Sequence, residues 1–396
     1  MPVLPGIAFL LNKRHFIMAY SGDTMQPYNV IKSFFRRESL LCVCMGFAIF
    51  SMVFVPPSIQ YAQYIDIKVL CLLFCLMAVV SGFEQCGLFS VLSRKLLKGE
   101  KSFRILVFIL VLLPFFSAML VTNDVALIAF VPLTITALRQ IDRGDALVRI
   151  VVLQTIAANL GSMATPVGNP QNLYLYSAYS LSAVLFFKIM LPLSLFSLLV
   201  LTAASLLTKG IPVTVEIAPA HTKQPRLLAL YSILFVLCLL SVFSLLSYWI
   251  LTAIVLLCMF IFSPSLFKTV DYPLLLTFVC FFIFAGNMGQ IAQVQLLIGN
   301  LLAKNTLLCA VVASQFISNV PAAVLLSQFT QDWAGLLLGV NIGGLGTPIA
   351  SLASLISLKY YMRTENSRPL YYLGVFTTFN LVGLMLLLAI VHLLGY

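Results

Sequence analysis

Two short polar stretches interrupt the most apolar parts of the chain, and they contain residue types that bind small ions. The first, VTNDVAL, holds Thr122, Asn123 and Asp124, and the second, QFISNVP, holds Ser318 and Asn319. Hydroxyl, amide and carboxylate oxygens are hard ligands that suit a small cation. A carboxylate can also hold a proton, so the two stretches are candidates for a site that binds and releases ions.

Each polar stretch is followed by an apolar segment that proline and glycine interrupt. The first segment reads ANLGSMATPVGNPQNLYLYSAY from Ala158, and the second reads VNIGGLGTPIASLASLISLKYY from Val340. At a constant offset of 182, four residues of the first match four of the second: Asn159 with Asn341, Gly161 with Gly343, Thr165 with Thr347, and Pro166 with Pro348. Because proline removes a helical hydrogen bond, we expect a broken helix in each segment. Unwound carbonyl groups would add ligands for a cation, and the N-termini of half helices would attract an anion.

These patterns define three overlapping sets of candidate site residues. The substrate-binding set is Asn123, Asp124, Thr165, Pro166, Asn169, Ser318, Asn319, Thr347 and Pro348. The cation-binding set is Thr122, Asn123, Gly168, Ser318, Asn319 and Gly346. The proton-coupling set is Asp124 and Glu84, because an ionisable group within an apolar span is a functional hypothesis by default. The alternatives are a helix cap for Asp124 and a polar cap at the membrane interface for Glu84.

Composition predicts that these residues lie in a membrane. The chain has 396 residues, of which 61% are hydrophobic and 9% charged, whereas a soluble protein has about 25% charged residues. Apolar runs of about 20 residues, enough to cross a bilayer core of about 30 Å, recur along its length. Full spans are predicted at about 39–58, 66–90, 184–208, 227–246, 249–264, 272–290 and 371–394. The alternating pattern of a barrel is absent, so the fold class is an all-α polytopic membrane protein.

The charged loops predict how the chain is oriented. The net charge is +11, and the basic residues gather in loops that share one side if the N-terminus is cytoplasmic. This pattern favours orientation in a cytoplasmic membrane over binding of nucleic acid. Residues 105–138 have basic flanks at both ends but are too short for two crossings of about 20 residues each. We therefore expect a re-entrant hairpin there, and a second one around Ser318 that enters from the opposite side.

The elements together predict two repeats of opposite orientation. Residues 1–37 are expected to form a cytoplasmic or interfacial lead-in. The first repeat, residues 38–208, contains the hairpin at 105–138 and a broken helix at 147–183. After a cytoplasmic linker at 209–226, the second repeat, residues 227–396, contains a hairpin at 298–331 and a broken helix at 335–359. Inverted repeats with discontinuous helices that meet at mid-membrane are typical of secondary transporters.

The motifs VTNDVAL, TPVGNPQN and QFISNVP resemble those of the ion transporter superfamily, over roughly residues 38–394. This superfamily contains sodium–dicarboxylate symporters, citrate transporters and arsenical pump membrane proteins, and the chain is most similar to its citrate-transporter-like anion permeases. The resemblance implies a homodimer and an elevator-like displacement. In the dicarboxylate symporters both tips read Ser-Asn-Thr. Here Asp124 and Val320 replace the two threonines, and the Asn-Asp tip is more similar to the arsenical pump proteins.

The sequence therefore predicts a secondary active transporter for a small anion, coupled to a proton or sodium gradient by alternating access. It predicts no enzyme, because no paired catalytic acids and no Ser–His or His–Glu arrangement stand out. A metalloid efflux permease for arsenite, a sodium/proton antiporter and an ion channel stay open as alternatives. The expected partners are the anionic or metalloid substrate, the lipid bilayer and a second copy, and no cofactor is expected beyond Na⁺ or H⁺. Proton coupling is favoured, because Val320 leaves the second tip poor in cation ligands.

Overall fold

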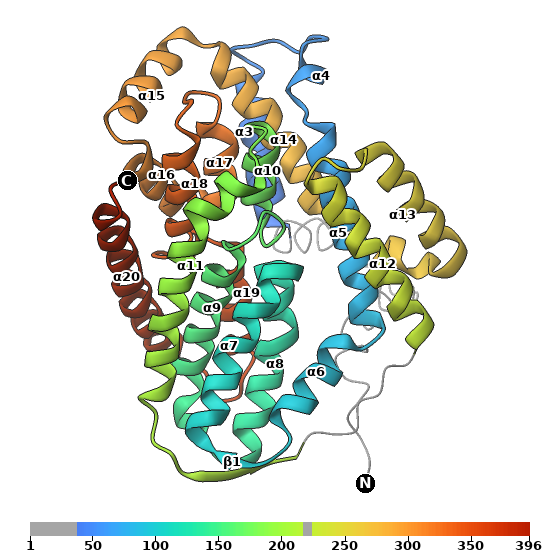
Figure 1. Ribbon diagram of the computed structural model, residues 1–396. Helices are drawn as coiled ribbons and strands as arrows, with labels where there is room; N and C mark the ends of the chain where they lie inside the picture. Colours follow the sequence, from blue (N-terminus) through green and yellow to red (C-terminus); the bar gives the residue numbers. More distant parts are fainter. Residues whose placement is uncertain (1–37, 217–223) are drawn as a thin grey trace, which may run out of the picture.

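The computed structural model describes residues 38–216 and 224–396, which form a helical molecule (Figure 1). The first half contains α3 (Ser39–Ser51), α4 (Tyr61–Tyr64), α5 (Ile67–Gln85), α6 (Leu88–Leu97), α7 (Phe103–Val121), α8 (Asn123–Gln140), α9 (Leu147–Ser162), α10 (Pro170–Ala178) and α11 (Ala183–Leu206). The second contains α12 (Pro225–Val242), α13 (Tyr248–Phe262), α14 (Tyr272–Gln290), α15 (Ala292–Lys304), α16 (Thr306–Ile317), α17 (Asn319–Leu326), α18 (Trp333–Ile342), α19 (Leu352–Met362) and α20 (Pro369–Leu393). The predicted lead-in at 1–37 and residues 217–223 of the predicted linker lie outside the described residues.

The predicted all-α membrane fold is confirmed. Within the described ranges, seven helical segments are long and apolar enough to cross a membrane, or eight if α15 and α16 count as one bent span. The seven are α5, α7, Gly144–Ser162, α11, α12, α14 and α20. Most of these correspond to apolar runs of the sequence, because in a bilayer an uninterrupted apolar run is stable only as a helix that satisfies its own backbone.

The predicted span at 39–58 is too long. Helix α3 has 13 residues and ends at Ser51, so at 1.5 Å per residue it is about 20 Å long, shorter than a bilayer core of about 30 Å. Turns follow, and then Pro56 and Pro57. Because proline lacks a backbone N–H, the helix cannot continue through these two residues. The apolar run therefore extends beyond the end of the helix.

The helices pack in two groups (Figure 1). We define the hairpin group as α7–α11 with α16–α20, and the frame group as α3–α5 with α12–α14. Within the hairpin group, α7 packs on α8 and α9, α16 packs on α17 and α18, and α19 packs on α8 and α9. Helices α6 and α15 connect the two groups along the chain. The groups also contact each other in space, where α14 packs on α17 and α5 packs on α10. The hairpin group therefore combines segments from both halves of the sequence.

One small β-ribbon was not predicted. Strand β1 (Gly99–Ser102) pairs antiparallel with β2 (Pro212–Val215), with Gly99 opposite Val215 and Ser102 opposite Pro212. The ribbon joins the segment before α7 to the segment after α11. Strands of four residues have no measurable hydrophobic period, so only the tertiary structure reveals this pairing.

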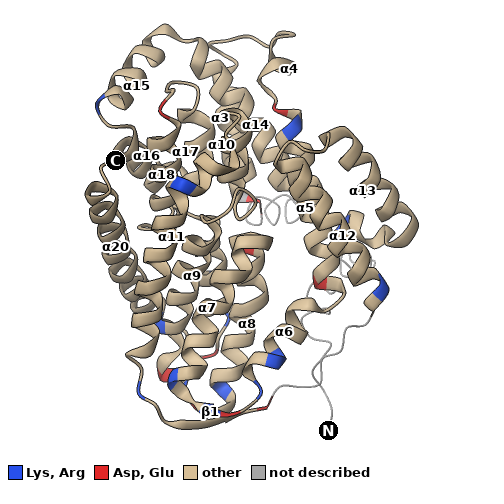
Figure 2. Cartoon of the chain, in the orientation of Figure 1, with Lys and Arg blue, Asp and Glu red and all other residues tan. Residues whose placement is uncertain are grey.

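Basic residues gather at the end of the molecule that contains the ribbon (Figure 2). The loops there connect α6 to α7, α8 to α9 and α11 to α12. In this region the Arg143 guanidinium lies over the Phe103 ring, 4.5 Å from the centroid, and forms an ion pair with Asp145 at 3.1 Å. The charged end and the apolar outer faces of the helices together fit a protein that crosses a bilayer.

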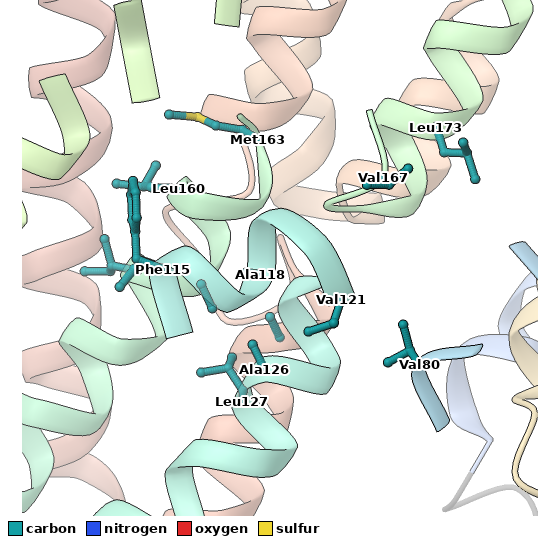
Figure 3. Close-up of a cluster of buried hydrophobic side chains, with 14 of the residues drawn as sticks. Val80, Phe115, Ala118, Val121, Ala126, Leu127, Leu160, Met163, Val167 and Leu173 are labelled. Carbon is teal, nitrogen blue, oxygen red and sulfur yellow. The ribbon is translucent and has the colours of Figure 1, made fainter. Parts of the chain in front are cut away.

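The turn between α7 and α8 is surrounded by a closely packed apolar core (Figure 3). Phe115 and Ala118 of α7 and Ala126 of α8 are fully buried, and Leu160 of α9 lies beside them. Gly161 permits this approach, because a Cβ atom there would collide with the backbone of Phe115. The core holds the α7–α8 turn firmly against α9.

Candidate functional site

Each predicted tip turns at one residue, and both residues have the same unusual backbone conformation. Thr122 separates α7 from α8 with φ 76° and ψ 151°, and Ser318 separates α16 from α17 with φ 72° and ψ 154°. A positive φ is uncommon for a residue with a Cβ atom and costs about 1–3 kcal/mol. The second hairpin consists of α16 and α17, because residues before Asn305 belong to α15, which meets α16 at 119°.

Each tip is bound to the helix break that follows it in the chain. In the break between α9 and α10, the Thr165 hydroxyl donates to the backbone oxygen of Met119 at 2.5 Å. In the break between α18 and α19, the Thr347 hydroxyl donates to the backbone oxygen of Gln315 at 3.0 Å. Met119 and Gln315 each lie three residues before their tip residue. The two halves therefore repeat one contact between the threonine of the break and the last turn before the tip.

Asn159 connects the first tip to the second half of the chain. The Asn123 Nδ2 donates to Asn159 Oδ1 at 2.9 Å, and the Ser351 hydroxyl donates to the same oxygen at 2.9 Å. The Asn159 Nδ2 in turn donates to the backbone oxygen of Gly344 at 3.4 Å. All four residues are buried. The amide of Asn159 thus holds the start of α8 and the start of α19 together.

A second amide cluster joins the two helix breaks directly. Asn169 caps α10, since its Oδ1 accepts the backbone N–H of Asn172 at 2.8 Å. The Asn169 Nδ2 donates to Asn341 Oδ1 at 3.1 Å, and the Asn341 Nδ2 donates to Asn172 Oδ1 at 2.7 Å. A buried amide left unpaired costs about 1–3 kcal/mol. These satisfied amides therefore stabilise the arrangement of the breaks relative to one another.

Four helix N-termini meet around one pocket. The residues that line it are Asn123 and Asp124 of α8, Pro170 and Gln171 of α10, Ser318 to Pro321 at α17, Ser351 and Leu352 at α19, and Leu40, Leu274, Thr277 and Phe281 of the frame group. The first turn of a helix carries unpaired N–H groups and the positive end of the helix dipole. Among the described residues of the lining there is no lysine or arginine. The attraction that these described residues offer an anion therefore comes from backbone and amide groups.

Asp124 is the one acidic residue among the described residues of the lining. It is half-buried, its Oδ1 is enclosed, and that oxygen has no hydrogen-bond partner among the described residues. Its backbone N–H donates to Asn123 Oδ1 at 3.0 Å, and no side chain caps α8. An enclosed carboxyl oxygen without a donor requires a proton, a cation or an ordered water. The carboxyl group is thus available to a ligand of the pocket.

Two further amides face the pocket without a protein partner. The side chains of Gln171 and Asn319 are buried, and neither forms a hydrogen bond with any described residue. Each amide offers two N–H donors and one carbonyl acceptor. Gln171 and Ser351 are absent from the sequence-based sets. Gln171 directly follows the proline that begins α10 within the motif TPVGNPQN. This position at the start of a helix is the feature of the sequence that could have identified Gln171 as a site residue.

The structure brings four of the predicted site residues into the pocket and leaves the others outside its lining. Those in the lining are Asn123, Asp124, Ser318 and Asn319. Those outside are Thr122, Thr165, Pro166, Gly168, Asn169, Thr347, Pro348, Gly346 and Glu84. Asn169 is occupied by its cap and its amide contacts. Glu84 is exposed in the last turn of α5.

The two helix breaks differ in their surroundings. Pro166 is buried and Thr165 is half-buried, whereas Thr347 is exposed and Pro348 half-buried. Gly346 has φ +112°, a conformation that favours glycine, and a Cβ atom there would collide with the side chain of Gln315. The equivalence that the sequence predicts for the two breaks therefore holds for their contacts with the tips, but not for their burial.

A helical protein of many membrane spans, with a polar pocket enclosed by two tips and two interrupted helices, has the construction of a membrane transporter. Comparison with known proteins agrees. The profile of the citrate transporter family matches residues 30–335. An uncharacterized transporter of Methanocaldococcus jannaschii, MJ0456, is 31% identical over 81% of this chain and 88% of its own length. The inner membrane protein YbiR of Escherichia coli is 32% identical over 81% of this chain and 86% of its own length.

The chain belongs to the citrate transporter family and is a membrane transporter embedded in a lipid bilayer. A shorter similarity, 30% identity over 33% of this chain, connects it to the putative transporter arsB of Dictyostelium discoideum, of which it covers 23%. These findings confirm the resemblance noted in the motifs.

Proposed function

We propose that this protein is a secondary active transporter that moves a small anion across the cytoplasmic membrane by alternating access, with a proton or a sodium ion as the coupling ion. The proposal depends on one observation: four helix N-termini converge on a pocket whose described lining contains a single carboxyl group. Helix N-termini attract negative charge, whereas a carboxylate repels it. Anion binding is therefore linked to a cation at Asp124.

The size of this linkage is large enough for coupling. Two like charges about 4 Å apart repel by about 4 kcal/mol at an effective dielectric constant of about 20. A proton on Asp124 removes this repulsion and adds a hydrogen-bond donor, and a sodium ion would compensate the charge. By reciprocity, an anion that binds better to the cation-loaded site also increases the affinity for the cation. The proton is favoured, because the second tip has Val320 where a further cation ligand would stand.

The dimensions of the pocket support a small substrate. The space open to the centre of a water-sized molecule is about 30 Å³, and one water requires about 10–15 Å³. A tricarboxylate such as citrate would need a wider opening between the tips, and the described lining has no basic side chain to neutralise its three charges. An inorganic anion or a small carboxylate fits this conformation better.

An uncharged metalloid hydroxide such as arsenite is the second candidate. The specific observation that favours it is the described part of the lining, which offers amide and carboxyl groups but no lysine or arginine. Such groups can form hydrogen bonds with neutral hydroxyl groups. The two candidates differ in their dependence on pH, because ionisation of Asp124 opposes an anion much more strongly than a neutral hydroxide.

Two features support alternating access. The pocket lies where the hairpin group meets α3 and α14 of the frame group, and the amide clusters fix both halves of the hairpin group as one body. Movement of that body past the frame group would expose the pocket to one side and then the other. The homodimer and the cytoplasmic N-terminus remain predictions, and the name of the E. coli relative, an inner membrane protein, supports the location.

A thermal-shift screen of the purified protein tests the proposal. A ligand that binds only the folded state raises the melting temperature by mass action. The panel contains phosphate, sulfate, mono-, di- and tricarboxylates and arsenite, each with and without sodium, at acidic and mildly alkaline pH. We expect one small anion to stabilise the protein, with a larger shift at acidic pH or with sodium. A shift with arsenite alone supports the second candidate, and no shift with any compound contradicts both.

A further inference from the structure

An apolar groove runs between α9, α11 and α20, away from the pocket of the tips. Its volume is about 250 Å³, and the side chains that line it include Leu153, Val200 and Val382. Only two polar side chains border it, and both are satisfied within their own helices. The Ser197 hydroxyl donates to the backbone at 2.7 Å and the Thr378 hydroxyl at 2.9 Å. A groove without free polar groups does not hold water well.

The helices that border the groove have the length and the exposed apolar side chains of membrane spans. Helices α11 and α20 have 24 and 25 residues and are candidate membrane spans. Leu199 and Met385, which lie on these two helices, are 69% and 65% exposed. The protein's own side chains leave this space open, and its size and apolar lining suit a flexible hydrocarbon chain.

Two arginines converge on the last turns of α11, at one end of the groove. The Arg149 Nη2 donates to the backbone oxygen of Ala204 at 3.0 Å, and the Arg104 Nε donates to that of Thr208 at 2.9 Å. Ala204 also lines the groove. These contacts cap the carbonyl end of the helix, but each uses only one of the five N–H donors of its guanidinium.

These cations are not neutralised by ion pairs within the described residues. In the part of the chain that the structure describes, neither Arg104 nor Arg149 forms an ion pair, and Lys209 follows directly after α11 without one. A cluster of arginine and lysine with free donors is a typical site for a phosphate group. The cluster lies at the end of α11 that leads into the β-ribbon, where the helix leaves the apolar region.

We propose that this site binds an anionic phospholipid. Its phosphate is held by Arg149 and Arg104, and one acyl chain lies in the groove between α9, α11 and α20. Free phosphate would use only the arginines, and a neutral lipid would use only the groove. Because the arginines and the groove meet at Ala204, the site fits a molecule that has both a phosphate group and an acyl chain. The proposal does not depend on the identity of the transported substrate.

Lipid binding to the full-length, delipidated protein in detergent tests the proposal, with native mass spectrometry and thermal shift as readouts. The probes are phosphatidylglycerol and phosphatidylcholine with identical chains, and inorganic phosphate. We expect phosphatidylglycerol to bind more tightly than phosphatidylcholine, and any thermal shift with inorganic phosphate to be the same in the wild type and in Arg149→Gln. Arg149→Gln should weaken phosphatidylglycerol binding about fivefold, the effect of one basic residue near an anionic lipid. Arg226→Gln, which changes an exposed arginine of α12 outside the groove, is the matched control.

Val200→Phe gives an independent test, because it fills the groove and leaves the arginines intact. It should reduce binding of both lipids. Equal binding of the two lipids to the wild type, or an undiminished preference for phosphatidylglycerol in Arg149→Gln, would overturn the proposal. So would a stabilising shift with phosphate that Arg149→Gln removes, because it would assign the arginines to a soluble anion. A change from dimer to monomer in Val200→Phe would assign the groove to contact between copies instead.

Discussion

At the scale of single residues, the proposed function makes Asp124 the group through which pH acts on the pocket. As the pH rises, ionisation of this carboxyl group places a negative charge beside a bound anion. We therefore expect anion affinity to fall by about 10- to 1000-fold across the titration, which corresponds to at most about 4 kcal/mol of repulsion. Asp124→Asn retains shape and hydrogen bonding but cannot ionise, so its affinity should not depend on pH. Isothermal titration of the anion found in the screen, over a pH series, measures this.

Glu84→Gln is the matched control for Asp124→Asn. Glu84 is exposed at the end of α5, outside the pocket lining, so this variant should keep the pH profile of the wild type. An unchanged pH profile in Asp124→Asn would show that another group carries the coupling. Loss of pH dependence in Glu84→Gln would move the proton site to α5.

Gln171 should contribute to ligand affinity without contributing to stability. Its amide has no partner among the described residues, so Gln171→Leu should weaken anion binding by about 5- to 150-fold, or about 1–3 kcal/mol, with little change in melting temperature. Gln154→Leu should behave in the opposite way. The Gln154 Nε2 donates to the backbone oxygen of Leu110 at 2.7 Å and to Thr134 at 2.8 Å, far from the lining. If Gln171→Leu binds the anion like the wild type, the amide has no role in the pocket.

The sequence predicts some of these residues and not others for a clear physical reason. Asn123, Asp124 and Asn319 stand out because a polar group in an apolar run needs a partner or a function. The sequence predicts Asn159 only as the residue that matches Asn341 in the second half. Its role as acceptor for Asn123 and Ser351 depends on contacts across 36 and 192 positions of the chain, which no local pattern contains.

At the scale of elements, the close approach of α7 and α9 depends on Gly161. A Cβ atom at this position would collide with the backbone of Phe115, which cannot move without displacing α7. Gly161→Ala should therefore destabilise the protein by about 1–3 kcal/mol through overpacking. Gly374→Ala on α20 is the control, since nothing lies near its added Cβ atom. It should be neutral or stabilising by about 0.4–1 kcal/mol. Chemical denaturation in detergent compares the two, and equal stability would contradict the close contact.

Hydropathy predicts most helices here, because a long apolar run in a membrane has few alternatives to a helix. Hydropathy fails where a helix ends although the sequence stays apolar. Helix α3 stops at Ser51, although apolar residues continue to Val55. The bend at Asn305 between α15 and α16 also escapes prediction, since its cap depends on one asparagine that accepts the backbone N–H of Leu308 at 2.7 Å.

At the scale of the whole molecule, the two halves repeat the same contacts at their tips but bury their helix breaks to different extents. Both tips have nearly the same dihedral angles, and both are held by a threonine of the following break. Yet Thr347 is exposed where Thr165 is half-buried. Two halves of similar construction in unequal surroundings are the expected result if one conformation of an alternating cycle is observed. The sequence alone predicts the similarity but not which break is covered.

Movement of the hairpin group past the frame group can be tested with two disulfides in a protein without its nine native cysteines, which are all free thiols. The first joins Thr277→Cys of α14 to Val320→Cys of α17, which line the same pocket from different groups. The second joins Thr155→Cys of α9 to Ser357→Cys of α19, whose hydroxyl oxygens lie 2.7 Å apart within the hairpin group. Because only the first disulfide connects bodies that must separate, it should stop anion uptake into proteoliposomes, and reduction should restore it. The second should leave uptake unchanged, since the amide clusters already hold its two helices together. Uptake that survives the first disulfide would favour a static pore, and uptake lost with the second would show that the hairpin group does not move as one body.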